Sequence, residues 1–441
     1  MRSISRAMRR SFTTLHRRPL PVPTPQRLPQ NEPVDEEICP GYNSKKFYPA
    51  RPGDVLDDHY QILVKVGWGV SSTTWFARDM RGYRWEPEGV VALKITNTDS
   101  QTGARERDIE DHIAKADPSH RGRALFRTYL GSFEICSPEG ERHLCFAYEP
   151  MREPLWIFQR RFKDGIIPLP LIKTYVRVLL IGLDYLHTSC SIVHTDLKLD
   201  NIMVTFEDPV VLNEYMDSQL NSAMQYKTDL SGRPVYRCCN DFGPLRKVRN
   251  IPKIVDFGLS TRLPSQNDRG IYPIQPDHYR APEVILGCGW STSTDIWNFG
   301  VLLWDMIQGR ELFQHIHNTQ GHYAAKSHLA EMIGFLGPPP RELVEKAGSM
   351  SGQQWPEPIK GEDDEICSSA MEYFGGPFFD GDGNFLHDDL IPARKLADTL
   401  HSLDEREREG FLSFVGTMLA WLPEDRKTAR ELADHPFLRV K

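Results

Sequence analysis

Residues 191–203 constrain this chain more than any other stretch, because they set four polar side chains of different chemistry between apolar flanks. His194, Asp196, Lys198 and Asn201 bring an imidazole, a carboxylate, an amine and an amide together within eight residues. The apolar flanks predict two short buried strands. A polar loop held between two buried strands is a rigid mount for chemistry. A polar turn without chemistry is the alternative, and the rest of the sequence decides between the two.

The spacing H-x-D-x-K-x-x-N resembles the catalytic loop of protein kinases. That resemblance implies that Asp196 accepts the proton of the attacking hydroxyl and that Lys198 steadies the transferred phosphoryl group. It also implies that Asn201 holds a magnesium ion.

Composition excludes several classes of protein. The 441 residues are 40% hydrophobic and 26% charged, as in an ordinary soluble globular protein. A formal charge of −7 argues against binding nucleic acid through bulk charge. No apolar run approaches the ~18 residues of a membrane helix. Eight scattered cysteines without a CxxC pair predict free thiols in a reducing compartment.

Residues 1–45 differ in composition from everything that follows. Arginines such as Arg2, Arg6 and Arg9 precede the first acidic residue, Glu32, and apolar residues recur at helical spacing. Such a start is typical of a mitochondrial transit peptide. The alternative, which we favour, is a basic disordered tail that includes a flexible proline-rich linker. If these residues are a tail, we expect the protein in the cytoplasm, the nucleus or both. If they are a leader, we expect it in mitochondria.

A glycine-containing turn follows a predicted strand. Gly67, Trp68 and Gly69 open it, and two glycines let backbone amides press onto phosphate oxygens that a side chain would block. The kinase pattern G-x-G-x-x-G-x-V is partly met, since Ser72 replaces the third glycine and Thr74 the valine. The resemblance implies that this turn covers the phosphates of ATP.

Lys94 lies within the apolar run VVALKI, where a lysine requires a negatively charged partner. ATP phosphates and a carboxylate from the next helix would supply it. Glu106 shares a helical face with Ile109 and Ile113, so we expect Glu106 to pair with Lys94. Glu110 is the alternative partner. A further alternative for either glutamate is a solvated helix face without a role in pairing.

A second apolar run, LCFAY, ends at Tyr148. In protein kinases such a strand end guards the adenine pocket, and the residues after it contact adenine through their backbone. The resemblance therefore implies Tyr148 as gatekeeper and Glu149 and Met151 as the contacts, because the proline between them has no amide hydrogen. Ala92 and Met203 complete the nucleotide site that the resemblance implies.

Two triplets have the sequence Asp-Phe-Gly, which in protein kinases carries a metal-binding aspartate. The triplet that begins at Asp241 follows CCN and precedes a proline, so no strand would present its carboxylate. The triplet that begins at Asp256 follows the apolar run KIV, which would place the carboxylate rigidly. We therefore expect Asp256 and Asn201 to bind Mg²⁺ through hard oxygen ligands.

The segment from Asp256 to Glu283 ends in YRAPE and is typical of a kinase activation segment. Its glutamate commonly pairs with an arginine near the C-terminus, and Arg426 is available. Asp295 opens a long apolar helix, and we expect it either to cap that helix or to brace the backbone of the catalytic loop.

Between positions 357 and 389, ten acidic residues face a single lysine, Lys360. Such a run is most often a solvated face, and its functional interpretation is a dock for an arginine-rich peptide. Residues 380–384 resemble the start of a calcium loop. Ile391 stands where the twelfth-position glutamate should be, so we expect a tight turn instead.

From about residue 46 to residue 440 the chain resembles eukaryotic protein kinases, and within them the SR-protein kinases, especially short fungal members. The cues are the GWG turn followed by STTW, a threonine after His194, an insert before the second Asp-Phe-Gly triplet and an extra segment from residue 338. The resemblance implies an α+β, two-lobed kinase fold. Its expected parts are a tail at 1–45, a small mostly-β lobe at 46–150 and a large mostly-α lobe at 151–441 with inserts at about 205–250 and 338–405.

The implied function is ATP- and Mg²⁺-dependent phosphorylation of serine or threonine in protein substrates, with Arg-Ser-rich splicing factors as expected targets. A monomer without direct nucleic-acid or membrane partners is expected. Thr195 replaces an arginine that receives an activation-loop phosphate, and Pro276 replaces a threonine that bridges the catalytic Asp and Lys. A pseudokinase scaffold is the alternative, although Lys94, Asp196 and Asp256 are all retained.

Overall fold

The computed structural model describes residues 17–82, 88–98, 100–265, 267–361 and 364–439, and the basic start on which the alternative of a leader depends lies mostly outside them. The chain forms two compact units. Unit 1 comprises Met1–Ala104, Tyr129–Arg152 and Phe206–Arg249, and unit 2 comprises Arg105–Thr128, Glu153–Thr205 and Asn250–Lys441. Helix α1 (Ser100–Lys115) contributes residues to both. Every helix in the described part of the chain is too short or too polar to span a bilayer.

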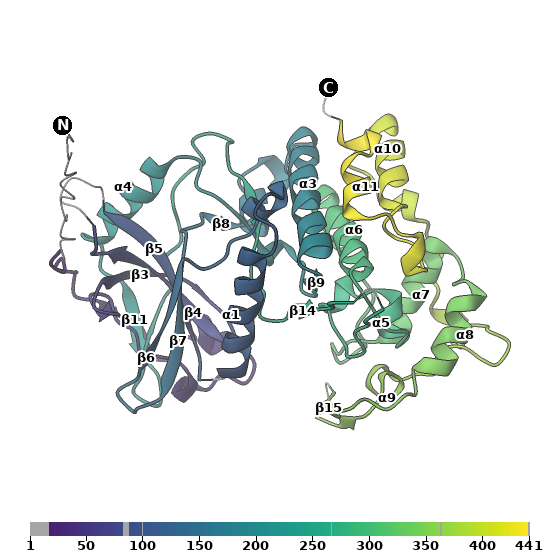
Figure 1. The fold of residues 1–441 in the computed structure, drawn as a ribbon, viewed down its shortest axis with the longest axis horizontal. Helices are drawn as coiled ribbons and strands as arrows, with labels where there is room; N and C mark the ends of the chain where they lie inside the picture. Colours follow the sequence, from purple (N-terminus) through teal and green to yellow (C-terminus); the bar gives the residue numbers. More distant parts are fainter. Residues whose placement is uncertain (1–16, 83–87, 99, 266, 362–363, 440–441) are drawn as a thin grey trace, which may run out of the picture. The chain divides into compact units, whose positions relative to one another are not determined.

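A six-stranded antiparallel sheet lies in unit 1 (Figure 1), with the strand order β2-β3-β4-β5-β7-β6. Aliphatic and aromatic residues, several of them β-branched, fill the long inner strands, as β propensity favours. The strands are β2 (Val55–Leu56), β3 (Tyr60–Trp68), β4 (Ser72–Asp79), β5 (Gly89–Thr96), β6 (Gly131–Cys136) and β7 (Arg142–Tyr148).

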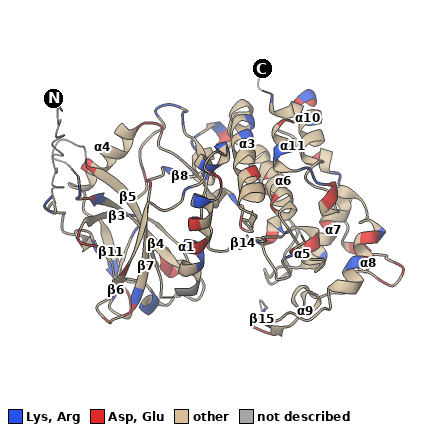
Figure 2. Cartoon of the chain, viewed as in Figure 1, with Lys and Arg blue, Asp and Glu red and all other residues tan. Residues whose placement is uncertain are grey.

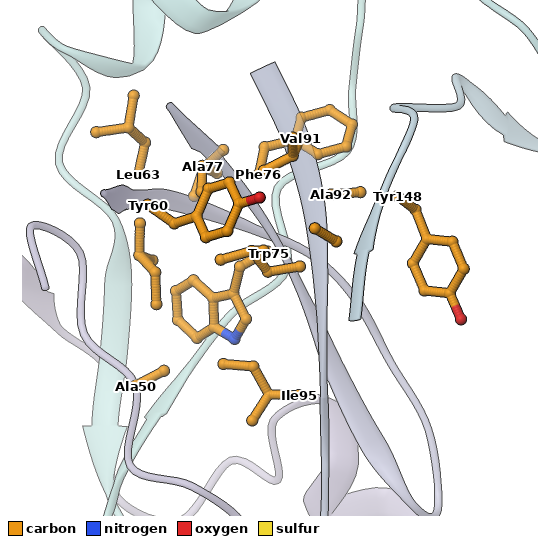
Figure 3. Packing of buried hydrophobic residues seen from close by; sticks show 14 of the residues in the cluster. Ala50, Tyr60, Leu63, Trp75, Phe76, Ala77, Val91, Ala92, Ile95 and Tyr148 are labelled. Atoms are coloured by element: carbon orange, nitrogen blue, oxygen red, sulfur yellow. The ribbon is translucent and has the colours of Figure 1, made fainter. Parts of the chain in front are cut away.

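The hydrophobic core of unit 1 joins this sheet to the segment 206–249. Figure 3 shows part of this core, including Trp75 and Phe76. Helix α4 (Pro209–Gln219) adds Tyr215, whose ring centroid lies 6.3 Å from that of Phe76. Full burial of one such side chain contributes roughly 2 kcal/mol. The segment 206–249 therefore packs within unit 1, whereas the sequence predicted an insert of the large lobe.

Residues 17–45 are also packed within unit 1, which corrects the expectation of a disordered tail for this part of the chain. Val34 and Glu36 are 2% and 1% exposed. Burial and backbone pairing with a distant segment fix these residues, and a local composition rich in proline does not reveal such partners. The pairing runs through the strands β1 (Gln26–Arg27), β11 (Gln225–Thr228) and β12 (Pro234–Tyr236), with β1 parallel to β11.

Unit 2 is mostly helical. Helix α3 (Leu169–Asp184) packs against α6 (Ser293–Gln308) and α11 (Ala429–Ala433) (Figure 1). Helix α6 is buried along almost its whole length, in keeping with its apolar sequence. The other elements are α2 (Leu155–Gln159), α5 (Pro282–Ile285), α7 (Ala325–Leu336), α8 (Arg341–Met350), α9 (Ala370–Phe374), α10 (Glu405–Val415), β15 (Ile359–Lys360) and β16 (Ile366–Cys367).

The segment that resembles a calcium loop is a tight turn, as predicted. Asp380 Oδ1 accepts hydrogen bonds from the backbone amides of Asp382 and Asn384, each at 2.9 Å. The carboxylate thereby closes its own turn.

Candidate active site

The catalytic loop is held between two short strands, as its apolar flanks predicted. Both residues of the first strand are fully buried, and so are the two ends of the second, where Met203 in the middle is partly exposed. Apolar burial and backbone pairing therefore anchor the loop at both ends. The first strand, β9 (Ile192–Val193), pairs with β14 (Thr261–Arg262), and the second, β10 (Ile202–Val204), pairs with β13 (Pro252–Ile254) and β8 (Glu153–Pro154).

Asp196, Lys198 and Asn201 converge within the loop. Asn201 Nδ2 donates to Asp196 Oδ2 at 2.7 Å and to the Asp196 backbone oxygen at 2.9 Å. Lys198 Nζ lies 3.1 Å from the same Oδ2. Asp196 is 8% exposed, while the Lys198 side chain is 34% exposed. Both side-chain contacts use Oδ2, and a carboxylate can accept further hydrogen bonds through its second oxygen.

The backbone of Val255, the residue before Asp256, is hydrogen-bonded to the catalytic loop. Val255 donates its N–H to the Asn201 oxygen at 3.0 Å, and His194 Nε2 donates to the Val255 oxygen at 3.1 Å. The Phe257 ring packs edge-on against His194, with 5.3 Å between centroids. Strand β13 is the strand that the sequence predicted before Asp256, and the Asp256 side chain is exposed.

The other Asp-Phe-Gly triplet forms a turn in unit 1. Asp241 Oδ1 accepts a hydrogen bond from the Gly243 amide at 3.0 Å. The Phe242 ring packs against Tyr215 and Phe206, at 4.7 and 5.1 Å between centroids. Its phenylalanine is thus a core residue of unit 1 and its aspartate stabilises the turn, which supports the choice of Asp256 for the metal.

Four non-glycine residues in this part of unit 2, among them Ser191 with φ of 54°, have left-handed backbone conformations. Thr195, Asp256 and Gln275 have φ of 69°, 67° and 71°. Each such residue costs on the order of 1 kcal/mol and persists only where its surroundings hold it. Thr195 Oγ1 donates to the Leu259 oxygen at 2.9 Å, and Gln275 Oε1 accepts from the Ala281 amide at 2.8 Å. Strain of this kind gathers at functional sites.

Helix α6 braces the backbone of the catalytic loop. Asp295 accepts hydrogen bonds from the amides of His194 and Thr195, at 2.8 and 3.1 Å. This confirms the brace, one of the two roles predicted for Asp295. Asn298 Nδ2 donates to the Leu197 oxygen at 2.5 Å. Asn298 was not predicted from the sequence, although a polar residue one helical turn after Asp295 in an apolar helix was a usable signal.

In unit 1 the sheet register relates the glycine turn to Lys94. Gly67 lies opposite Thr74, and Thr74 lies opposite Lys94 on the next strand. Neighbouring strands are ~4.8 Å apart, so the backbones of Gly67 and Lys94 lie on the order of 10 Å apart in one row of the sheet. The turn is closed by a hydrogen bond from the Gly69 amide to the Ser72 oxygen at 2.9 Å.

Of the residues expected around adenine, Ala92 and Tyr148 lie on adjacent strands of unit 1, Glu149 and Met151 follow β7, and Met203 lies on β10 in unit 2. Ala92 is the cross-strand partner of Tyr148, and both side chains are buried. Met151 is buried as well, whereas Glu149 is exposed. Trp68, in the glycine turn, is 42% exposed.

Helix α1 carries both expected partners of Lys94. Glu106 and Glu110 are 2% and 1% exposed, and Ile113 on the same helix is fully buried. A solvated helix face is therefore excluded for both glutamates. Lys94 belongs to unit 1 and the two glutamates belong to unit 2.

Glu283 and Arg426 form the ion pair that the sequence predicted. Arg426 Nη1 and Nη2 donate to the two carboxylate oxygens at 2.6 and 2.7 Å, in the bidentate geometry that arginine favours. Both side chains are almost completely removed from solvent. The pair ties the end of the activation segment to the C-terminal part of unit 2.

Comparisons with known proteins agree with this geometry. A model of the protein kinase domain matches residues 60–438. A serine/threonine protein kinase of Aspergillus fumigatus is 34% identical over 428 residues, which cover 95% of this chain and 96% of that protein. The serine/threonine-protein kinase SRPK of Physarum polycephalum is 29% identical over 428 residues, with 92% and 91% covered. A crystal structure of a kinase domain matches with a TM-score of 0.61 at 21% identity, over 90% of this chain and 100% of that one.

The chain therefore belongs to the protein kinase family, among its serine/threonine protein kinases. The α+β kinase fold predicted from the sequence is confirmed, and the fold match and the family match agree on it.

Proposed function

We propose that this protein uses ATP and Mg²⁺ to phosphorylate serine or threonine in Arg-Ser-rich segments of protein substrates, such as splicing factors. The observation that carries the proposal is the convergence of Lys198 and Asn201 on one carboxylate oxygen of Asp196. A cation and an amide fix the carboxylate through one oxygen, and the second oxygen can then accept from a substrate hydroxyl, as a positioned base requires.

In this mechanism Asp196 orients the acceptor hydroxyl and accepts its proton. The acceptor oxygen forms a bond to the γ-phosphorus as the bond from that phosphorus to the leaving ADP oxygen breaks. Lys198 neutralises charge on the transferred group. Lys94 and the backbone amides of 67–72 hold the phosphates, so positioning and charge neutralisation supply most of the rate gain.

Two residues of unit 2 fit a magnesium ion. Both hydrogen bonds from the Asn201 side chain use Nδ2, which leaves its amide oxygen for a cation, and Asp256 adds an exposed carboxylate. Mg²⁺ favours such hard oxygen ligands and keeps phosphate and water in its remaining positions. In the described residues no group of three or more His, Cys, Asp and Glu forms a metal site by itself. Bound Mg²⁺ would neutralise the phosphate oxygens during transfer.

Pro276 is compatible with this chemistry. It stands where a threonine would bridge the catalytic aspartate and lysine. Lys198 contacts Asp196 directly at 3.1 Å, so the pair is held without a bridging hydroxyl.

Exposed carboxylates favour a basic substrate segment. Residues 364–389 contain seven acidic residues and no lysine or arginine, and all seven are exposed. Helix α8, in contrast, carries charges of both signs (Figure 2). A surface of one sign steers and retains a peptide of the opposite sign. The relative named SRPK supports the same class of substrate.

Phosphate transfer from labelled ATP tests the proposal, with two peptides of equal length. One carries Arg-Ser repeats, and the control carries Glu-Ser repeats. We expect Mg²⁺-dependent labelling of serine in the first peptide and at least about tenfold less in the second. Nucleotide binding by thermal shift without transfer to either peptide would contradict the proposal and favour a scaffold.

We further propose that the protein acts in the cytoplasm, the nucleus or both. A fluorescent protein fused to the C-terminus of the full chain should show these compartments. Signal confined to mitochondria would contradict this placement.

A further inference from the structure

Lys65, two residues before the glycine turn, is a buried cation. Its side chain is 1% exposed within strand β3. A buried ammonium group is strongly destabilising unless nearby groups compensate its charge and accept its hydrogens. Here those groups come from segments that are remote in sequence.

The N-terminal segment supplies the negative charge. Lys65 Nζ contacts Glu36 Oε2 and lies 3.0 Å from Asp35 Oδ2, and it donates to the Tyr236 oxygen at 2.8 Å. Glu36 is 1% exposed, and Arg233 Nη2 lies 3.0 Å from its second oxygen. The cation is therefore matched by two carboxylates, one of which is itself shared with an arginine.

The backbone around Lys65 is held by the N-terminal segment and by the segment 206–249. The Cys239 amide donates to the Lys65 oxygen at 2.8 Å, and the Cys238 amide donates to Asp35 Oδ2 at 2.6 Å. Main chain and side chain of Lys65 are thus both attached to residues outside the sheet.

Strand β3 changes register between Lys65 and the glycine turn. Lys65 lies opposite Trp75, but Gly67 lies opposite Thr74, so the chain advances two residues along β3 and only one along β4. This extra residue in β3 is a β-bulge. Because successive side chains alternate between faces, Lys65 shares the face of Trp75, and Gly67 shares the face of Thr74 and Lys94. The bulge therefore lies directly between the anchored lysine and the turn.

We propose that Asp35 and Glu36 are positioning residues for nucleotide binding. Through Lys65 they fix the bulge of β3, and through the bulge they fix the turn at 67–72. The inference rests on the proposed function, because it assumes that this turn covers the phosphates of ATP. According to this proposal, the N-terminal segment helps to position the nucleotide site and is not merely a tail.

Binding of a non-hydrolysable ATP analogue with Mg²⁺ to the full chain, measured by calorimetry, tests this role without turnover. In Lys65→Met the side chain keeps a similar volume and Glu36 keeps its pair with Arg233, whereas Asp35 loses its cation. We expect the Kd for the analogue to rise about tenfold, since small misplacements of binding groups have effects of this size. Amide hydrogen exchange should accelerate at 67–72, while the KM for peptide should stay near its wild-type value.

Glu36→Gln is the second variant, and its Kd for the analogue tests the positioning role if Lys65→Met does not fold. Glu32→Gln is the matched control, because its exposed pair with Arg237, at 2.6 Å, lies in the same segment. The control should bind as the wild type does. Wild-type affinity in both Lys65→Met and Glu36→Gln, or equal weakening in Glu32→Gln, would overturn the positioning role. A wild-type protein that does not bind the analogue would contradict the proposed function instead.

Discussion

The carboxylate of Asp295 accepts a hydrogen bond from the backbone amide of His194 at 2.8 Å, across 101 positions of sequence. The same carboxylate accepts from the Thr195 amide at 3.1 Å, and His187 Nε2 lies 2.9 Å from it. Asp295 is fully buried, so these contacts hold the start of the catalytic loop in one position.

Replacing Asp295 with asparagine tests that brace. An amide has one oxygen and would turn its NH₂ group toward a donor, so the start of the loop would shift. We expect kcat to fall at least about tenfold, with little change in the KM for ATP. Steady-state kinetics would measure both constants, and Asp217→Asn, at an exposed position in α4, is the control. An unchanged kcat in Asp295→Asn would show that the brace is dispensable.

The buried pair of Glu283 and Arg426 predicts a large effect on stability. Arg426→Met leaves a buried carboxylate without its partner, and we expect the free energy of unfolding to fall by about 3–5 kcal/mol. Urea unfolding would measure the loss. Arg430→Met, at a side chain that is 68% exposed, should cost much less. Equal stability of the two variants would contradict this account of the pair.

Asp305 predicts a dependence of stability on pH. Burial raises the pKa of Asp305 to about 8, and Tyr279 donates to its Oδ2 at 2.8 Å. The folded protein therefore holds a proton that the unfolded chain releases above about pH 4. The stabilisation is full below that pH and is lost as the pH rises through the raised pKa.

We therefore expect this carboxyl group to lower the Tm of the wild type as the pH rises from about 4 to about 8. In Asp305→Asn, which cannot ionise, this fall should be smaller by roughly 2 °C or more. Differential scanning calorimetry across this range would measure both slopes. Identical slopes in the two proteins would contradict the raised pKa.

The two Asp-Phe-Gly triplets predict opposite responses to magnesium. Asp256→Asn should abolish the gain in ATP affinity that Mg²⁺ gives, because it removes the only charged ligand we assign to the ion. Asp241→Asn should keep that gain, since its carboxylate only closes a turn in unit 1. Calorimetry with and without Mg²⁺ would separate the two. The reverse result would move the metal site to Asp241.

Sequence alone was sufficient where the signal is local. The strands on either side of Asp196 and the strand before Asp256 follow from apolar runs within a short window, and the structure shows each of them. A short apolar run is enough to determine a buried strand, so such a strand can be predicted from the local sequence alone.

The sequence was insufficient where the cause is a distant partner. Glu36 is ordered because it meets Lys65 and Arg233, which lie 29 and 197 positions away. Proline-rich composition around Glu36 suggested a linker, and no local pattern shows that its charge is buried. The partner of Asn298 is likewise a backbone oxygen 101 positions away, although the place of Asn298 in an apolar helix gave a local signal. Tertiary contacts of this kind override local propensity.

The central claim is that Asp196, held by Lys198 and Asn201, is the base of a phosphoryl transfer. Single-turnover transfer from labelled ATP to an Arg-Ser peptide tests it most directly, with wild type and Asp196→Asn compared at saturating ATP and peptide. We predict that the variant binds ATP as the wild type does and transfers phosphate at least about 10²-fold more slowly. Transfer by Asp196→Asn at the wild-type rate would contradict the claim.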